Sequence, residues 1–147
     1  MRPVPARADD APALARILSD WIDETAWMPD IHTPDEDRRH LLHLIATCEV
    51  VILRDGQPIH GFLARDGARL HALYLVPGAR GKGMGKHLLD LAKSRSDRLE
   101  LWSFQANSGA RSFYAREGFD EVEMTDGADN DEKMPDVRLV WVREGKP

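Results

Sequence analysis

The sequence predicts an α/β domain in which helices flank a mixed, mostly antiparallel sheet. Three patterns lead to this fold class. Between Leu70 and Ser94 an apolar run is followed by a glycine-rich loop and an amphipathic helical pattern. The turn signals Asp55-Gly56 and Asp66-Gly67 join strand-like segments into a meander. Two amphipathic helices precede them, and 147 residues suffice for one core, so we expect a single domain over residues 1–147.

The N-terminal part is expected to form a short strand and two helices. Residues 2–7 contain two prolines, which favour a strand at the edge of the sheet. Asp9 or Asp10 is expected to cap a helix whose amphipathic pattern extends to Ile22. Thr33 is expected to cap the second helix, because a proline and three acidic residues follow it.

The strands are expected from alternating or β-branched segments that end at turn residues. A helix is expected between the strands at 99–104 and 121–125, with Asn107 or Ser108 as its cap and Gly118 at its end. The expected strands are 49–54, 58–65, 69–76, 99–104, 121–125 and 137–143.

Composition restricts the function classes. A net charge of −5 argues against a general nucleic-acid binder. No apolar run is long enough to span a bilayer, and no signal-peptide pattern opens the chain. Cys48 is the single cysteine, which rules out an internal disulfide and fits a reducing compartment. We therefore expect a cytoplasmic protein that does not act at a membrane.

The glycine-rich loop at 80–86 reads Arg-Gly-Lys-Gly-Met-Gly-Lys and lies between a predicted strand and a predicted helix. Backbone N–H groups in the first turn of a helix have no internal partner, and the helix dipole makes that end positive. Glycines allow a ligand to approach these groups closely. The loop thus predicts an anion site suited to phosphate or pyrophosphate, with a basic surface turn as the alternative.

Two well-known phosphate loops do not fit this segment. A dinucleotide fingerprint that begins at Gly81 requires glycine at position 86, where the chain has Lys86. The nucleotide-triphosphate loop requires a glycine five residues before a Gly-Lys pair. The chain has Arg80 or Val76 at the two possible positions.

A third pattern does fit. Arg80, Gly83 and Gly85 match Arg/Gln-x-x-Gly-x-Gly/Ala, and residues 107–119 match Asn-x-x-Ala-x-x-Phe-Tyr-x-x-x-Gly-Phe at every named position. In this order and spacing, the two motifs resemble those of the GNAT superfamily of N-acetyltransferases. The resemblance is good from 49 to 119 and looser outside that range.

The resemblance implies a GNAT-like fold in which the strand before the glycine loop splays from the strand after it. Coenzyme A would enter this gap, with its pyrophosphate on the loop and its pantetheine amides paired with the strand before the loop. The residues expected to bind the cofactor are Leu73, Tyr74, Leu75, Arg80, Gly81, Lys82, Gly83, Met84, Gly85, Lys86, Asn107 and Tyr114.

The implied activity is transfer of an acetyl group from acetyl-CoA to a primary amine of an unidentified small molecule or peptide, by direct attack in a ternary complex. In the family, a tyrosine seven residues after the motif asparagine protonates the departing thiolate, and Tyr114 follows Asn107 by seven. The alternative for Tyr114 is simple packing on the core. A backbone N–H near Leu75 would be the family's oxyanion donor.

The general base is not predicted. Some relatives carry a glutamate five residues before the motif asparagine, where this chain has Trp102, which cannot accept a proton. A water chain is an equal alternative. The candidates by residue type alone are Glu24, Asp30, His32, His71 and Glu100.

Large apolar residues in irregular segments often line ligand sites, so Trp27, Met28 and Trp102 are expected to contact the acceptor. Trp21 and Phe104 are further candidates for the pocket wall, although ordinary core packing explains Trp21 equally well. The acidic segment 126–132 would attract a cationic acceptor or is a plain solvated loop. No metal is expected, because a solvated helix face explains His40 and His43 better than a ligand pair does.

Two other functions are compatible with these motifs. One is an acyltransferase that uses a longer acyl-CoA. The other is a coenzyme A-binding sensor or regulatory module without turnover, which the tryptophan at position 102 favours. A homodimer is left open.

Overall fold

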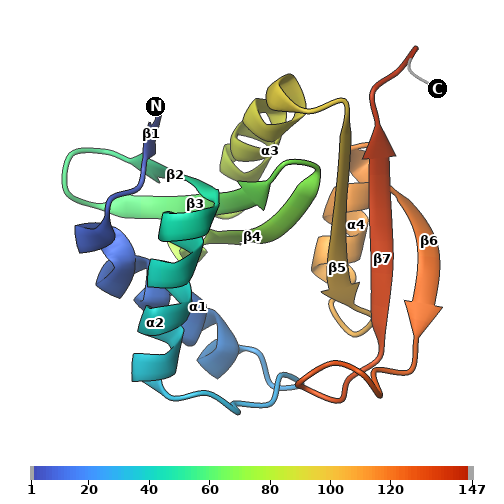
Figure 1. The fold of residues 1–147 in the computed structure, drawn as a ribbon, viewed down its shortest axis with the longest axis horizontal. Helices are drawn as coiled ribbons and strands as arrows, with labels where there is room; N and C mark the ends of the chain where they lie inside the picture. Colours follow the sequence, from blue (N-terminus) through green and yellow to red (C-terminus); the bar gives the residue numbers. More distant parts are fainter. Residues whose placement is uncertain (1, 146–147) are drawn as a thin grey trace.

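The computed structural model describes residues 2–145 and contains one mixed sheet flanked by helices (Figure 1). Within these residues the sheet has seven strands in the order β1-β2-β3-β4-β5-β7-β6. All neighbouring strands are antiparallel except β4 and β5, so the expected fold class is confirmed. The elements are β1 (Pro3–Pro5), η1 (Ala8–Asp10), α1 (Ala11–Glu24), α2 (Pro34–Thr47), β2 (Glu49–Arg54), β3 (Ile59–Asp66), β4 (Arg69–Leu75), η2 (Pro77–Ala79), α3 (Met84–Arg95), β5 (Arg98–Phe104), α4 (Ser108–Arg116), β6 (Asp120–Thr125) and β7 (Asp136–Val142).

The predicted strands are present, with ends that differ by about one residue. β1 lies at one edge of the sheet, as its prolines predict. The cap of α2 is also confirmed: Thr33 Oγ1 accepts the Glu36 N–H at 3.1 Å, and Glu36 accepts the Thr33 N–H at 3.1 Å. No helix in the described part of the chain is long and apolar enough to cross a membrane.

The predicted cap of α1 is wrong. Asp10 occupies the N-cap position, but its side chain makes no capping bond to the helix. Its carboxylate instead accepts the Arg7 N–H at 2.8 Å and lies 3.2 Å from Arg54 Nη1. The short helix η1 runs directly into α1 and leaves no extended residue from which a side chain could cap.

Strand alternation gives the sheet two apolar faces. Ile52, Phe62 and Tyr74 point to the face covered by α1 and α2. Leu53 and Leu63, one residue further along β2 and β3, point to the opposite face, which packs against α3 and α4. The helices α1 and α2 cover only the β1–β4 half of their face (Figure 1).

The two halves of the sheet meet at β4 and β5, where pairing is brief. The only registered pair is Arg69 with Glu100, and the Glu100 N–H donates to the Ala68 carbonyl at 2.8 Å. Beyond this point β4 pairs with β3 as far as Leu75, and β5 pairs with β7 as far as Phe104, but not with each other. The expected splay is therefore present and opens a gap between the strands (Figure 1).

The spacing of β3 and β4 depends on Gly61. A Cβ at this position would meet Leu75 Cδ2 and would lie 2.7 Å from the Tyr74 carbonyl oxygen. Gly61→Ala should lower the free energy of unfolding in urea by about 1–3 kcal/mol, since the end of β4 would have to shift. Gly78→Ala is the control, because nothing lies within 4 Å of its added Cβ. Equal stabilities of the two variants would contradict this account.

Candidate active site

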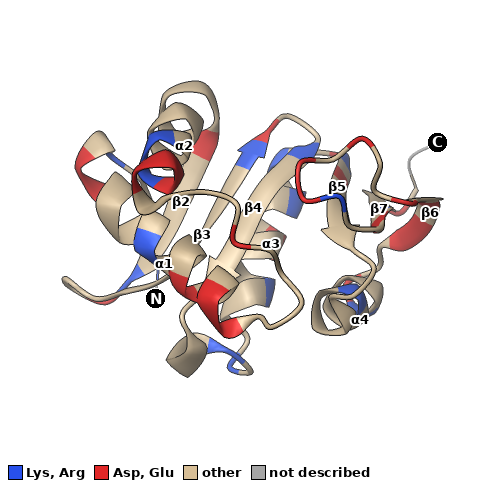
Figure 2. Cartoon of the chain, turned by 90° about the horizontal axis from the view of Figure 1, so that it is seen from below, with Lys and Arg blue, Asp and Glu red and all other residues tan. Residues whose placement is uncertain are grey.

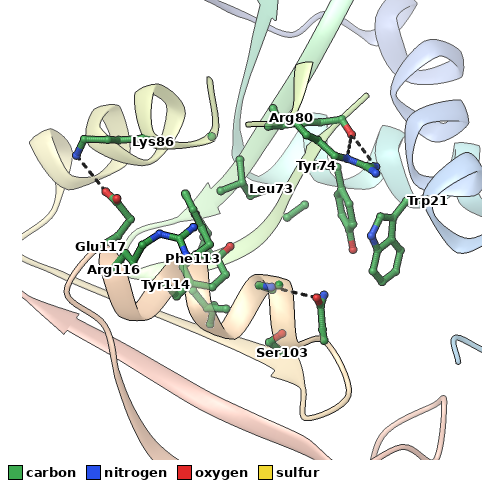
Figure 3. Close-up of a pocket in the computed structure, with 18 of the residues that line it drawn as sticks. Trp21, Leu73, Tyr74, Arg80, Lys86, Ser103, Phe113, Tyr114, Arg116 and Glu117 are labelled. Carbon is green, nitrogen blue, oxygen red and sulfur yellow. Dashed lines mark hydrogen bonds and ion pairs between the residues drawn. The ribbon is translucent and has the colours of Figure 1, made fainter. Parts of the chain in front are cut away.

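A cavity of about 580 Å³ occupies the gap between β4 and β5, with walls from α1, the glycine loop and α4 (Figure 3). It collects most of the side chains that the sequence singled out. Those that line it are Leu73, Tyr74, Leu75, Arg80, Gly81, Gly83, Gly85, Lys86, Trp102, Asn107 and Tyr114.

Four predicted site residues lie elsewhere. Lys82 is exposed on the loop and does not line the cavity, and Met84 packs half-buried against the core. Trp27 lines a neighbouring cavity of about 460 Å³ that shares several walls with the first. Met28 is half-buried and lines neither cavity.

The strand β4 presents free main-chain groups to the gap. The Val76 N–H donates to the His60 carbonyl at 2.9 Å, so the backbone groups at Val76 point toward β3. Antiparallel pairing alternates, and Tyr74 therefore also points its groups toward β3. The N–H and C=O groups of Leu73 and Leu75 point the other way, into the gap. The Leu75 C=O accepts from the Arg80 side chain there, and the other three groups are open to a ligand. An extended ligand with amide groups can pair with them as an added strand would.

The glycine loop ends in an uncapped helix. Gly81 and Gly83 have positive φ values of 74° and 81°, which glycine adopts readily. Gly83 is the N-cap of α3, and no side chain caps the helix. The His87 N–H makes the first helical bond, to the Gly83 carbonyl at 3.0 Å. The N–H groups of 84–86 therefore lack helical partners, which is the arrangement that an anion site at a helix start requires.

Carboxylates neutralise the two predicted cations of the cavity. Arg80 Nη1 lies 2.5 Å from Glu24 Oε1, and its Nε and Nη2 donate to the Leu75 carbonyl at 3.2 and 3.0 Å. Lys86 Nζ lies 3.1 Å from Glu117 Oε1, and this bond raises the pKa of Lys86. Sequence reasoning missed both pairs, because each partner is far away along the chain.

Tyr114 has a buried ring and an open hydroxyl. The ring packs edge-on against Phe113 and Phe119, with centroids 5.1 and 5.2 Å away. Among the residues described, the buried side-chain polar atoms without a partner are His60 Nε2 and Arg65 Nε. The Tyr114 hydroxyl also makes no hydrogen bond, but it is not one of these two buried atoms. It is therefore accessible from the cavity. Tyr114 therefore packs on the core through its ring and faces the cavity through its hydroxyl.

Asn107 holds the start of α4 and borders both cavities. Its Oδ1 accepts the Ala110 N–H at 3.1 Å, so the predicted cap is confirmed. Gly118 has a φ of 92° and ends the helix as predicted.

A chain of aromatic rings crosses the gap on the α1 side. Trp21 contacts Trp27 and Tyr74, with ring centroids 5.9 and 5.4 Å apart. Trp27 in turn contacts Phe104 on β5 at 5.8 Å. Trp102 lies on the same face of β5 as Phe104 and is 41% exposed. These rings form an aromatic wall on the face opposite Tyr114, and the cavity therefore opens on both faces of the sheet.

Of the five side chains considered as bases, His71 alone lines the larger cavity. Burial, followed by the charge of Arg69, lowers the pKa of His71, so its imidazole is neutral at pH 7. Glu24 lines the smaller cavity but is paired with Arg80. Glu100 is paired with Arg138 at 3.1 Å. In the described chain, no group of three or more His, Cys, Asp or Glu is placed to hold a metal.

Sequence reasoning missed several residues that line the larger cavity. Three of them, Phe113, Arg116 and Glu117, stand inside the 107–119 motif, and their helical spacing from Asn107 was the available signal. Ser103 was missed because its place in the wall depends on long-range folding. Trp21 and Phe104, candidates from the sequence for the wall of an acceptor pocket, do line the cavity.

The two tyrosines of the chain, Tyr74 and Tyr114, provide a pH test. Burial raises the pKa of Tyr74 to about 12, and burial also raises the pKa of Tyr114. The folded state therefore retains protons that the unfolded state releases near pH 10, and stability falls as pH rises above that value. Absorbance titration should show almost no tyrosinate in the folded protein at pH 10.5, whereas the protein in urea should titrate near pH 10. Tyrosinate formation near pH 10 without unfolding would contradict this burial.

Comparison with known proteins agrees with this geometry. The family model described as "Acetyltransferase (GNAT) domain" matches residues 17–131. The solution structure of apo YjaB from Escherichia coli superposes with a TM-score of 0.80 at 21% identity, covering 97% of both chains. The structure of yncA from Salmonella typhimurium with its cofactor acetyl-CoA gives a TM-score of 0.75 at 14% identity, covering 100% of this chain and 96% of that one.

Curated relatives match over shorter stretches. An uncharacterized N-acetyltransferase of Methanocaldococcus jannaschii is 36% identical over 96 residues, which cover 54% of this chain and 40% of the relative. Peptidyl-lysine N-acetyltransferase YjaB of Salmonella typhimurium is 27% identical over 63% of each chain. This chain thus spans between 40% and 63% of the length of these relatives. Since the family model covers most of the sequence and the fold agrees, the chain belongs to the GNAT family of acetyl-CoA-dependent N-acetyltransferases.

Proposed function

We propose that this protein moves the acetyl group of acetyl-CoA to a primary amine of a small molecule or peptide, by direct attack in a ternary complex. The observation that carries the proposal is the gap between β4 and β5, which combines free main-chain groups with the uncapped start of α3. We place the reaction in the cytoplasm and require no metal for it.

Each part of the gap suits one part of coenzyme A. The N–H groups of 84–86 bind the pyrophosphate, for which the helix end supplies a positive dipole. The backbone groups of Leu73 bind a pantetheine amide, which leaves the Leu75 N–H for the reacting carbonyl. Asn107 borders this path and its amide Nδ2 is free to donate, because the cap uses only Oδ1.

The chemistry requires a neutral amine, a donor for the oxyanion and an acid for the leaving thiolate. The amine nitrogen bonds to the thioester carbonyl carbon, and the C–S bond then breaks. The Leu75 N–H points into the gap and stabilises the negative oxygen. Tyr114 donates its hydroxyl proton to the thiolate sulfur and regains one from solvent. The attacking amine gives up one proton to water on the acceptor side, and a chain of waters carries it to bulk.

The acceptor approaches along the aromatic wall, where Trp27 and Trp102 border the cavities. Acidic residues occur at the end of α1 and on the loop between β6 and β7 (Figure 2), and they favour a cationic molecule there. The distant relative YjaB is named a peptidyl-lysine acetyltransferase. A lysine side chain is a primary amine of this kind, so lysine peptides belong among the acceptors to test.

The proposal is tested by incubating the protein with acetyl-CoA and a panel of lysine peptides, polyamines, aminoglycosides and amino acids. We expect release of free thiol together with a product that has gained one acetyl group by mass spectrometry. A longer acyl-CoA in parallel measures the acyl preference. Binding of acetyl-CoA by calorimetry with no turnover on any amine would favour a coenzyme A sensor, and absence of binding would overturn the proposal.

Gly83 tests the anion site. A Cβ added at Gly83 would have nothing within 4 Å, but a φ of 81° is unfavourable for most residues other than glycine. The test therefore compares two variants that share this backbone cost. Asn and Asp both tolerate this conformation comparatively well and differ only in charge. Gly83→Asp should weaken acetyl-CoA binding more than tenfold relative to Gly83→Asn, because its carboxylate would lie beside the pyrophosphate. Equal affinities by calorimetry would remove the loop from the site.

Tyr114→Phe removes the hydroxyl and retains the packed ring. Positioned acids contribute about 10²–10⁴ in rate, and a thiolate is a fair leaving group, so kcat should fall toward the low end of that range. Tyr74→Phe is the matched control for loss of a cavity hydroxyl, and its kcat should fall less. A Tyr114→Phe rate equal to that of the wild type, where chemistry is rate-limiting, would show that the thiolate does not need this proton.

A further inference from the structure

The cations that line the larger cavity differ in their pairing. Arg80 is bound by Glu24 and the Leu75 carbonyl, and Lys86 is bound by Glu117. Arg116 lines the same cavity and is exposed, and it has no ion pair or hydrogen bond among residues 2–145. Its positive charge is therefore the one in the described cavity wall that no carboxylate offsets.

Arg116 lies close to the predicted anion site. It stands one helical turn after Phe113, whose ring would be 3.5 Å from a Cβ at Gly85 in the first turn of α3. The adjacent carboxylate does not compensate it, because Glu117 Oε1 is bound to Lys86 at 3.1 Å and lies 3.9 Å from Lys93 Nζ. The side chains of Arg116 and Lys86 lie on facing helices beside the cavity (Figure 3).

We propose that Arg116 binds the 3′-phosphate of coenzyme A. The inference rests on the proposed function. Coenzyme A carries two anionic groups, the pyrophosphate and the 3′-phosphate, joined through one ribose. The N–H groups of 84–86 suit the first, and an unpaired guanidinium on the facing helix suits the second. Its planar, bidentate geometry matches a phosphate better than a lysine does.

A structural role for Arg116 must be separated from this one. The residue lies in the last turn of α4, where a cation interacts favourably with the helix dipole. That role would change the melting temperature and would not depend on which form of the cofactor is present. A comparison of two cofactors distinguishes the roles.

The experiment measures binding of acetyl-CoA and of 3′-dephospho-acetyl-CoA by calorimetry. The proteins are the wild type, Arg116→Gln, Arg116→Lys and the control Arg16→Gln. Arg16 is on α1 with a side chain 81% exposed, so its variant loses the same charge away from the cavity. Arg116→Gln should weaken acetyl-CoA binding about tenfold and should change binding of the dephospho form less than about twofold, since one charged hydrogen-bonding contact is lost.

Arg116→Lys should recover part of the acetyl-CoA affinity, and Arg16→Gln should bind both cofactors as the wild type does. An equal loss for both cofactors in Arg116→Gln, or no loss for either, would overturn the assignment while leaving the proposed function intact. A wild type that binds neither cofactor would overturn the proposed function, and this inference with it.

Discussion

The site depends on the short length over which β4 and β5 are paired. Beyond Arg69 and Glu100, β4 and β5 form no further backbone pairs, whereas the other neighbouring strands of the sheet stay paired along several residues. Unpaired backbone groups in a sheet interior cost free energy unless something binds them. The gap therefore lowers the stability of the sheet, and it also offers hydrogen-bonding groups to an extended ligand that carries amides. Each strand remains paired on its other side, β4 with β3 and β5 with β7, and this pairing holds the two edges of the gap.

Two ion pairs brace the borders of this gap. Glu24 and Arg80 connect the end of α1 to the segment after β4, and Lys86 and Glu117 connect α3 to α4. Both pairs are partly exposed, and such pairs contribute little to global stability. Their consequence is local: they hold the elements around the cavity in place and remove net charge from its rim. Arg116 is then the cationic side chain of the described cavity wall whose charge no carboxylate offsets.

The sequence predicts local features of this molecule well because local residues cause them. Thr33 begins α2, Asn107 begins α4 and Gly118 ends it, since each cap involves atoms within a few residues. Asp10 was misassigned because a preceding turn of 3₁₀ helix changed the entry into α1. The splay of β4 from β5 followed only from family resemblance. The partners of Arg80 and Lys86 could not be predicted at all, as they depend on how distant helices pack.

The aromatic wall has an optical consequence. The chain contains four tryptophans, of which Trp21 and Trp102 line the larger cavity and Trp27 lines the smaller. The fourth, Trp141, packs on the far side of the sheet beside Lys93. Indole emission responds to the polarity and the quenching groups around the ring. Three of the four indole rings therefore lie where ligands would bind, and the native chain contains its own reporter of occupancy without any attached dye.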